Sequence, residues 1–166
     1  MTTTPQIQIT KDLSAKKITV TRDFNATPEQ TWSAWTESEL LDLWWAPKPW
    51  KAETKSMEFR VGGYWLYAMV GPDNTRHWAR VDFTKIEKHK RMETRDAFCD
   101  DLGNINREMP VMTWKIDFEP IETGSQVIVE ISFTNESDLE KIVEMGFETG
   151  FASALTNLDE YFENQS

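Results

Sequence analysis

Histidine is the first side chain to consider for acid–base chemistry, and the 166-residue chain has 2 of them. The pattern of alternation places His77 on the same strand face as Val81 and Phe83, at the edge of any pocket on that face. Only in that position would its near-neutral titration be useful for proton transfer. A solvated histidine beside the polar turn at 71–76 is the alternative. His89 lies in a charged turn, which is typical of a surface residue.

Asp96 is the second candidate, because alternation puts it between Thr94 and Phe98 on one face of a strand. An aspartate on an inward face is costly to bury without a partner. Arg80 or Arg95 could supply that partner, whereas a shifted strand would expose the carboxylate. An enzyme that uses Asp96 or His77 with a bound water is therefore one hypothesis.

Other patterns that carry chemistry do not occur in the sequence. No Cys/His cluster has the spacing of a zinc site, so no metal is expected. Neither a glycine-rich phosphate loop nor a Gly-x-Ser-x-Gly turn is found, and we expect no cofactor. The single Cys99 cannot form an internal disulfide, which favours a reducing, cytoplasmic compartment.

The charge balance limits the classes of partner. With 18 basic and 28 acidic residues the net charge is −10, and nucleic acid and anionic membranes are disfavoured because both require a basic surface. No stretch approaches the roughly 20 apolar residues of a membrane span, and the polar N-terminus does not have the features of a targeting segment. The composition predicts an acidic, soluble protein whose oligomeric state is left open.

The chain is rich in aromatic side chains, with 8 Trp and 12% aromatic residues. Trp32 and Trp35 are three residues apart on an expected helix, a spacing typical of core. Trp44 and Trp45 are adjacent, so only one of them can face inward, and the other is expected at a cavity mouth. This surplus of rings favours a protein that encloses an apolar molecule, with ordinary core packing as the alternative.

The expected elements form an α+β chain. A strand at 18–24 precedes two short helices near 28–35 and 37–45, and antiparallel strands follow from about 53 to 134, including one through 57–61. One long helix of about six turns begins near Leu139. An antiparallel sheet wrapped around that helix is the architecture such an order predicts.

Three capping boxes mark the expected helix starts. They are Thr27 with Gln30, Thr36 with Glu39, and Ser137 with Glu140.

Two glycines interrupt the apolar stripe of the long helix. Gly146 and Gly150 fall at four-residue spacing, and glycine inside a helix costs up to about 1 kcal/mol relative to alanine. Close approach of the helix to the sheet is one explanation. Volume left open for a ligand is the other.

Several motifs together resemble the SRPBCC superfamily (START-like proteins with a helix-grip fold). They are the segment 19–36 with its Trp-Ser-Ala-Trp-Thr core, Trp44-Trp45-Ala46-Pro47, the Arg60-Val61-Gly62-Gly63 turn, and Gly146 to Phe151 in the closing helix. Within the superfamily the chain looks most like the branch of the heat-shock-protein-90 ATPase activator homologues. Val81 stands where many relatives have glycine.

The resemblance implies a helix-grip fold. A curved antiparallel sheet of about six strands would surround the C-terminal helix, with two short helices after the first strand. The domain would span 17–166, after an N-terminal extension at 1–16. It also implies an internal cavity that binds a small hydrophobic molecule. The candidate ligand-binding residues are Trp44, Trp45, Phe59, Trp65, Tyr67, His77, Phe83, Asp96, Phe98, Trp114, Phe118, Phe147, Gly150 and Phe151. A chaperone partner, whose ATPase the protein would stimulate, is the alternative function.

Overall fold

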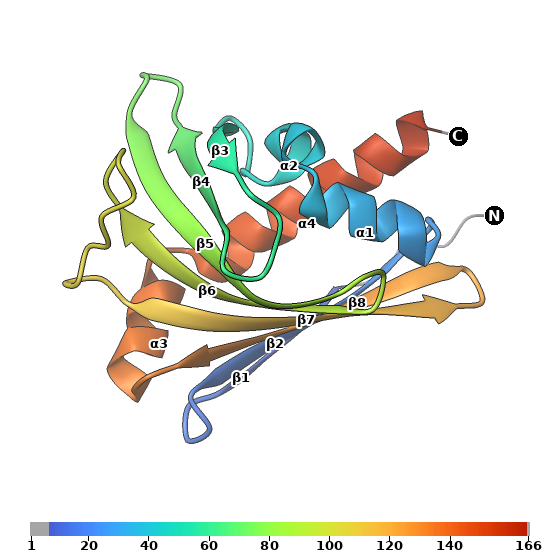
Figure 1. Cartoon of the computed structure of the whole chain (residues 1–166). Coiled ribbons are helices and arrows are strands. Elements are labelled where there is room, and N and C mark those ends of the chain that lie inside the picture. The colour runs from blue at the N-terminus through green and yellow to red at the C-terminus, as the bar shows by residue number, and fades with distance from the viewer. Residues whose placement is uncertain (1–6, 166) are drawn as a thin grey trace.

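An eight-stranded antiparallel sheet curves around the C-terminal helix in the computed structural model, which describes residues 7–165 (Figure 1). The strands are β1 Ile7–Asp12, β2 Lys17–Phe24, β3 Lys51–Met57, β4 Tyr64–Val70, β5 Arg76–Glu87, β6 Arg91–Cys99, β7 Val111–Ile121 and β8 Gly124–Phe133. The helices are α1 Pro28–Thr36, α2 Ser38–Trp44, α3 Glu136–Glu144 and α4 Phe147–Asn164. The strand order is β1-β2-β8-β7-β6-β5-β4-β3, so β1 and β3 are the edges.

The expectation of about six strands is too low, because both edge strands carry little hydrophobic signal. β1 lies within the segment at 1–16 that was expected as an extension, and it pairs antiparallel with β2, with Ile9 opposite Val20. β3 is mostly exposed and polar along its length. The strand expected through 57–61 ends at Met57, and the chain then turns back through Gly63. Edge strands with exposed faces do not require the alternation by which buried strands are recognised.

The first helix begins as its sequence predicts, and the second does not. Thr27 caps α1: its hydroxyl accepts from the Gln30 amide at 3.1 Å, and the Gln30 side chain accepts from the Thr27 amide at 2.8 Å. Thr36 does not cap α2, because its hydroxyl donates to the Trp32 carbonyl within α1 at 2.7 Å. Glu37 takes the capping position without a side-chain hydrogen bond.

The expected long C-terminal helix is two helices. Asn135, not Ser137, caps α3, and its side-chain oxygen accepts from the Asp138 amide at 2.8 Å. The helix ends at Glu144 with Met145 as its C-cap, and Gly146 adopts the left-handed conformation with φ of 88° before α4 begins. A left-handed glycine ends a helix readily because it has no Cβ to clash.

The concave side of the sheet and the helices form the core. Figure 1 shows α4 crossing this side of the sheet, with α1 and α2 beside it. Trp32 and Trp35 are each 4% exposed, which confirms their predicted place in the core. Arg22 on β2 forms an ion pair with Asp159 on α4, and this pair ties the first long strand to the last helix.

Candidate functional site

A cavity of about 240 Å3 lies between the concave side of the sheet and the last two helices. Strands β4 to β7 supply one wall, and α3, α4 and the chain after α2 supply the other. The lining residues are Trp45, Pro47, Tyr67, Met69, Ala79, Arg80, Val81, Asp96, Ala97, Phe98, Met112, Trp114, Ile142, Met145, Gly146, Phe147, Gly150 and Phe151. Most of these side chains are apolar, so the cavity is suited to an apolar guest.

Three aromatic rings from three distant elements meet in this wall. The ring centroids of Trp45 and Trp114 are 5.9 Å apart, those of Trp114 and Phe151 are 5.7 Å apart, and those of Trp45 and Phe151 are 6.1 Å apart. Phe147 stacks on Phe151 at 5.3 Å. Tilted and edge-to-face rings at these separations attract each other, so the wall is held in place without a ligand.

A hydrogen bond fixes Trp45 in the cavity wall. Its indole N–H donates to the Tyr67 hydroxyl at 2.9 Å, and the Tyr67 ring stacks on Trp65 at 4.0 Å between centroids. Burial raises the pKa of the Tyr67 phenol above its usual range, so the group is a neutral hydroxyl.

Trp44 and Trp45 are adjacent in the sequence, but their rings lie in different parts of the interior. Trp44 is 1% exposed, lies in the core, and donates from its indole N–H to the Ala34 carbonyl at 2.9 Å. Trp45 faces the cavity. Behind it, the side-chain amide of Asn157 on α4 donates to the carbonyls of Trp44 at 3.4 Å and Ala46 at 3.0 Å. These two bonds hold the end of α2 against α4.

The glycine positions leave open space and do not serve close packing. A Cβ added at Gly146 would meet no atom within 4 Å, and one at Gly150 would meet only the Pro47 ring at 3.8 Å. Both glycines line the cavity, and Gly146 lies in the break between α3 and α4. The structure therefore favours open volume as the explanation of the glycine spacing.

Asp96 is the acidic side chain of the cavity wall. It is 8% exposed, and one carboxylate oxygen accepts from the Thr94 hydroxyl at 2.6 Å. Burial, opposed by this hydrogen bond and reinforced by nearby Asp82, raises the pKa of Asp96 to about 7. The expected arginine partners do not reach it: Arg80 binds Asp82 at 2.7 Å, and Arg95 is exposed.

Asp96 also borders a deeper crevice of about 20 Å3 beneath the cavity. Trp45, Val81 and Trp114 line both spaces as well. These four side chains therefore form the partition between the cavity and the crevice. Val81, noted in the sequence as a departure from many relatives, is one of them.

The structure brings part of the predicted site together. Eight of its residues line the cavity: Trp45, Tyr67, Asp96, Phe98, Trp114, Phe147, Gly150 and Phe151. Trp65 and Phe83 line the deeper crevice instead. Trp44, Phe59, His77 and Phe118 line neither space.

Those four side chains are held elsewhere. Phe59 and Phe118 pack edge-on against Trp32, at 6.0 and 5.1 Å between ring centroids. His77 is exposed, and its ring lies 5.3 Å from that of Trp50. Its expected place at the pocket edge is therefore wrong, because β5 runs past the end of the cavity at that point.

Ten cavity residues were not among the predicted site residues. They are Pro47, Met69, Ala79, Arg80, Val81, Ala97, Met112, Ile142, Met145 and Gly146. Alternation along the strands could have identified some of them, because Met69 is two residues from Tyr67 and Met112 is two residues from Trp114. No comparable signal marks Pro47 or Met145, which reach the cavity through a loop and a helix break.

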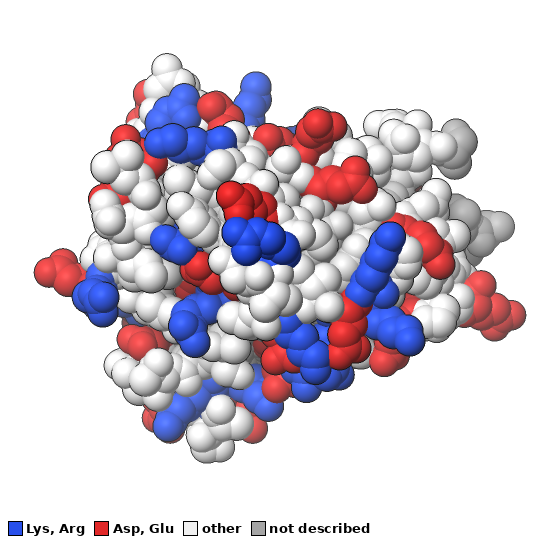
Figure 2. Space-filling view, viewed as in Figure 1, with Lys and Arg blue, Asp and Glu red and all other residues white. Residues whose placement is uncertain are grey.

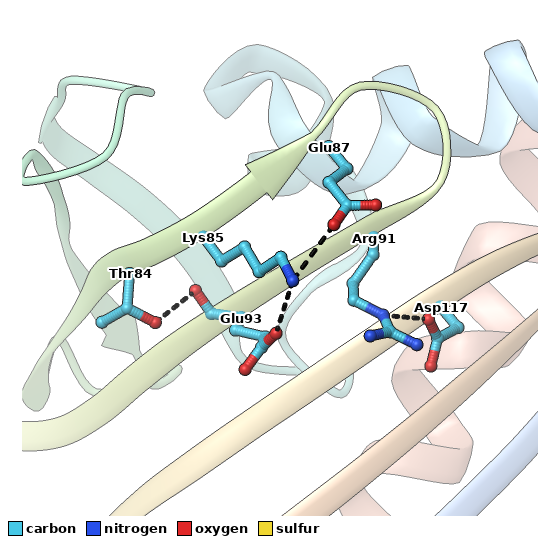
Figure 3. A network of polar contacts seen from close by, with 6 residues as sticks. All are labelled: Thr84, Lys85, Glu87, Arg91, Glu93 and Asp117. Carbon is cyan, nitrogen blue, oxygen red and sulfur yellow. Dashed lines mark hydrogen bonds and ion pairs between the residues drawn. The ribbon is translucent and has the colours of Figure 1, made fainter.

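A network of charged side chains in the described part of the chain lies on strands β5, β6 and β7. Lys85 bridges Glu87 at 3.1 Å and Glu93 at 3.8 Å, and Arg91 binds Asp117 at 2.5 Å (Figure 3). Lys85 and Glu87 are exposed, whereas Glu93, Arg91 and Asp117 are half-buried, and in each pair opposite charges on β5, β6 and β7 balance one another. Figure 2 shows acidic and basic side chains interspersed over this view, without a basic patch.

Metal-binding clusters and activated thiols are two further kinds of chemical site, and the described residues bear on both. Within residues 7–165, no group of three His, Cys, Asp or Glu side chains is placed to hold a metal ion. Burial raises the pKa of the Cys99 thiol to about 11, so it is not an activated nucleophile.

A larger hollow, of about 610 Å3, lies under the β1–β2 turn, but it is polar and lined mainly by exposed residues. No helix in the described part of the chain is long and apolar enough to cross a membrane.

Comparison with known proteins agrees with this architecture. The chain is similar to a solution structure of a protein from Arthrobacter aurescens, with 32% identity over 92% of this chain and 88% of that chain and a TM-score of 0.86. It is also similar to protein Ms6760 from Mycobacterium smegmatis, with 24% identity over 94% and 96% of the two chains and a TM-score of 0.87, a likeness that bears on the fold alone. No curated protein matches the chain.

The family model described as Activator of Hsp90 ATPase homolog 1-like protein matches residues 25–163. This match covers most of the chain and confirms the resemblance drawn from the sequence motifs. The chain belongs to the Activator of Hsp90 ATPase homolog 1-like family, a branch of the SRPBCC superfamily.

Proposed function

We propose that this protein binds a small hydrophobic molecule in the cavity between the sheet and helices α3 and α4. The observation that carries the proposal is an apolar, aromatic-walled space of about 240 Å3 in the interior of the domain. Ligand pockets commonly enclose about 300–1,000 Å3. The guest is therefore expected to be small.

The cavity wall supports binding because it is already ordered. Trp45 is held by its hydrogen bond to Tyr67, and the neighbouring rings pack on one another. A rigid wall loses little conformational freedom when a ligand arrives, which favours affinity. Met145 is 53% exposed and also lines the cavity, so it marks the side from which a ligand would enter.

Filling the cavity from α4 tests the proposal. Gly150→Leu would place a branched side chain in the space where a Cβ has a single neighbour. Thr156→Leu, at an exposed position of the same helix, is the matched control. We expect a panel of small apolar probes to change the Trp fluorescence of the wild type and of the control, and Gly150→Leu to weaken binding at least about tenfold.

Two results would contradict the proposal. One is a broad panel from which no probe alters fluorescence or thermal stability. The other is unchanged affinity in Gly150→Leu, provided its circular dichroism matches that of the wild type.

A second proposal comes from the family description, which names an activator of Hsp90 ATPase. The chain would then stimulate the ATPase of an Hsp90-type chaperone from the same cell. Steady-state ATPase assays with and without this protein test it. An unchanged rate, together with no capture of the chaperone in a pull-down, would remove this proposal and leave ligand binding unaffected.

A further inference from the structure

We propose that the ligand of this cavity is an apolar amine, whose protonated nitrogen pairs with the carboxylate of Asp96. The inference rests on the proposed binding function and names its substrate class.

Asp96 presents one unoccupied oxygen. Its Oδ1 accepts from the Thr94 hydroxyl at 2.6 Å, and no hydrogen bond to Oδ2 is found among residues 7–165. Asp96 is 8% exposed and lines the cavity, where a ligand can approach it. The Oδ2 atom is not one of the fully buried polar atoms of the described chain that lack a partner, so it keeps some accessible surface, and a donor on a ligand can reach it.

Within residues 7–165, no cationic side chain pairs with this carboxylate. Arg80 touches the cavity, but its guanidinium group is directed to the outer side of the sheet, where it binds Asp82 and the Gly103 carbonyl and stacks on Tyr64 at 3.9 Å. The ionisable groups that act on Asp96 are the acidic Asp82 on β5 and the neutral phenol of Tyr67 on β4. The cavity residues of α3 and α4 are apolar. A positive charge must therefore come with the ligand.

The aromatic wall suits a cation better than a neutral polar group. Trp45, Trp114, Phe147 and Phe151 line the same space as Asp96. Ring faces attract ammonium groups, most strongly when water is excluded. The net charge of −10 also raises the local concentration of cations around the protein. An anionic ligand meets the opposite conditions at Asp96, although the same wall holds one buried donor without a partner in the described part of the chain, the indole N–H of Trp114.

The affinity for an ammonium ligand should depend on pH, because Asp96 must lose its proton when the ligand binds. Burial raises the pKa of Asp96 to about 7, so the empty site is protonated in mildly acidic solution. An ammonium ligand must displace that proton, and its affinity should therefore rise by about tenfold per pH unit up to about pH 7 and then level. A neutral alcohol of the same shape releases no proton and should not follow this rise.

Three matched probes test the inference: phenylbutylamine, phenylbutanol and phenylbutyrate. Dissociation constants are measured by calorimetry or Trp fluorescence at about pH 6 and about pH 8, on either side of the titration. At the higher pH we expect the amine to bind at least about tenfold more tightly than the alcohol, and the carboxylate to bind most weakly. Asp96→Asn should lose the preference for the amine over the alcohol, and its circular dichroism shows whether the variant folds as the wild type does.

The outcomes separate this inference from the proposal beneath it. An alcohol that binds as tightly as the amine at the higher pH, or an amine affinity unchanged in Asp96→Asn, overturns the amine assignment while ligand binding stands. If no probe binds, both proposals fail. The pH series on the wild type needs no variant, so a poorly folded Asp96→Asn does not remove the test.

Discussion

Replacing Asp96 by asparagine tests the burial of this carboxyl through protein stability alone. The pKa of Asp96 is raised from 3.8 to about 7, chiefly by burial. Between these values the folded state holds a proton that the unfolded state has released, so the free energy of unfolding falls as pH rises. Each pH unit contributes about 1.4 kcal/mol, and the full interval gives about 4 kcal/mol as an order of magnitude.

Asparagine removes this titration while its side-chain oxygen can still accept from Thr94. Urea denaturation of the wild type and of Asp96→Asn, repeated from about pH 4 to about pH 8, measures the effect. We expect the stability of the variant relative to the wild type to grow by up to about 4 kcal/mol over this range. The difference between the two proteins cancels the titration of every other group. A difference that does not change with pH would refute the argument.

A change at Thr94 shifts the same curve in a predictable direction. The Thr94 hydroxyl lowers the pKa of Asp96 by donating a hydrogen bond to it. Thr94→Val should therefore extend the loss of stability to higher pH. Thr113→Val, at an exposed position of β7, is the matched control and should leave the pH dependence unchanged.

Three further predictions concern the framework of the site. Trp45→Phe removes the donor to Tyr67 and should lower the free energy of unfolding by about 1–3 kcal/mol; a urea-measured loss below about 0.5 kcal/mol would contradict that role. Arg22→Met leaves its carboxylate partner on α4 without a counter-charge and should cost about 3–5 kcal/mol in the same assay, with recovery when that carboxylate is also replaced by an apolar side chain. Gly124→Ala should destabilise far more than Gly146→Ala, because the new Cβ would lie 2.3 Å from a backbone oxygen at the first position and meet no atom within 4 Å at the second. The latter should cost only the left-handed strain of about 1–2 kcal/mol, and similar melting temperatures for the two variants would count against this reasoning.

The fold could be predicted from the sequence wherever elements are buried on one face. The alternation of β7 and β8 and the Thr27 capping box give strong local signals, because burial and capping demand particular residue types. The edge strand β3 does not give such a signal, since exposed positions accept most polar residues. The break at Gly146 was also missed. The apolar spacing continues across it, so the pattern of a single helix and that of two successive helices look alike.

The candidate site could be predicted only in part for a similar reason. Strand alternation identifies which side chains face inward, and it correctly grouped Tyr67, Asp96 and Trp114. It does not show how far along a strand the cavity extends, so His77 was included although it lies beyond the end of the space. The arginine partner expected for Asp96 depended on which face Arg80 uses, and only the three-dimensional arrangement answers that.

The position of Trp45 in the cavity wall depends on Asn157, a residue that does not line the cavity. Its side-chain amide donates to the carbonyls of Trp44 and Ala46, the residues on either side of Trp45. Ala46 and Asn157 are 111 residues apart in the sequence. These bonds fix the backbone at Trp45 and therefore the position of its ring. A substitution of Asn157 would alter the shape offered to a guest while every residue in contact with that guest stayed the same. Under the proposed binding function, two relatives with identical cavity linings would differ in selectivity if they differed at this position, which lies outside the pocket itself.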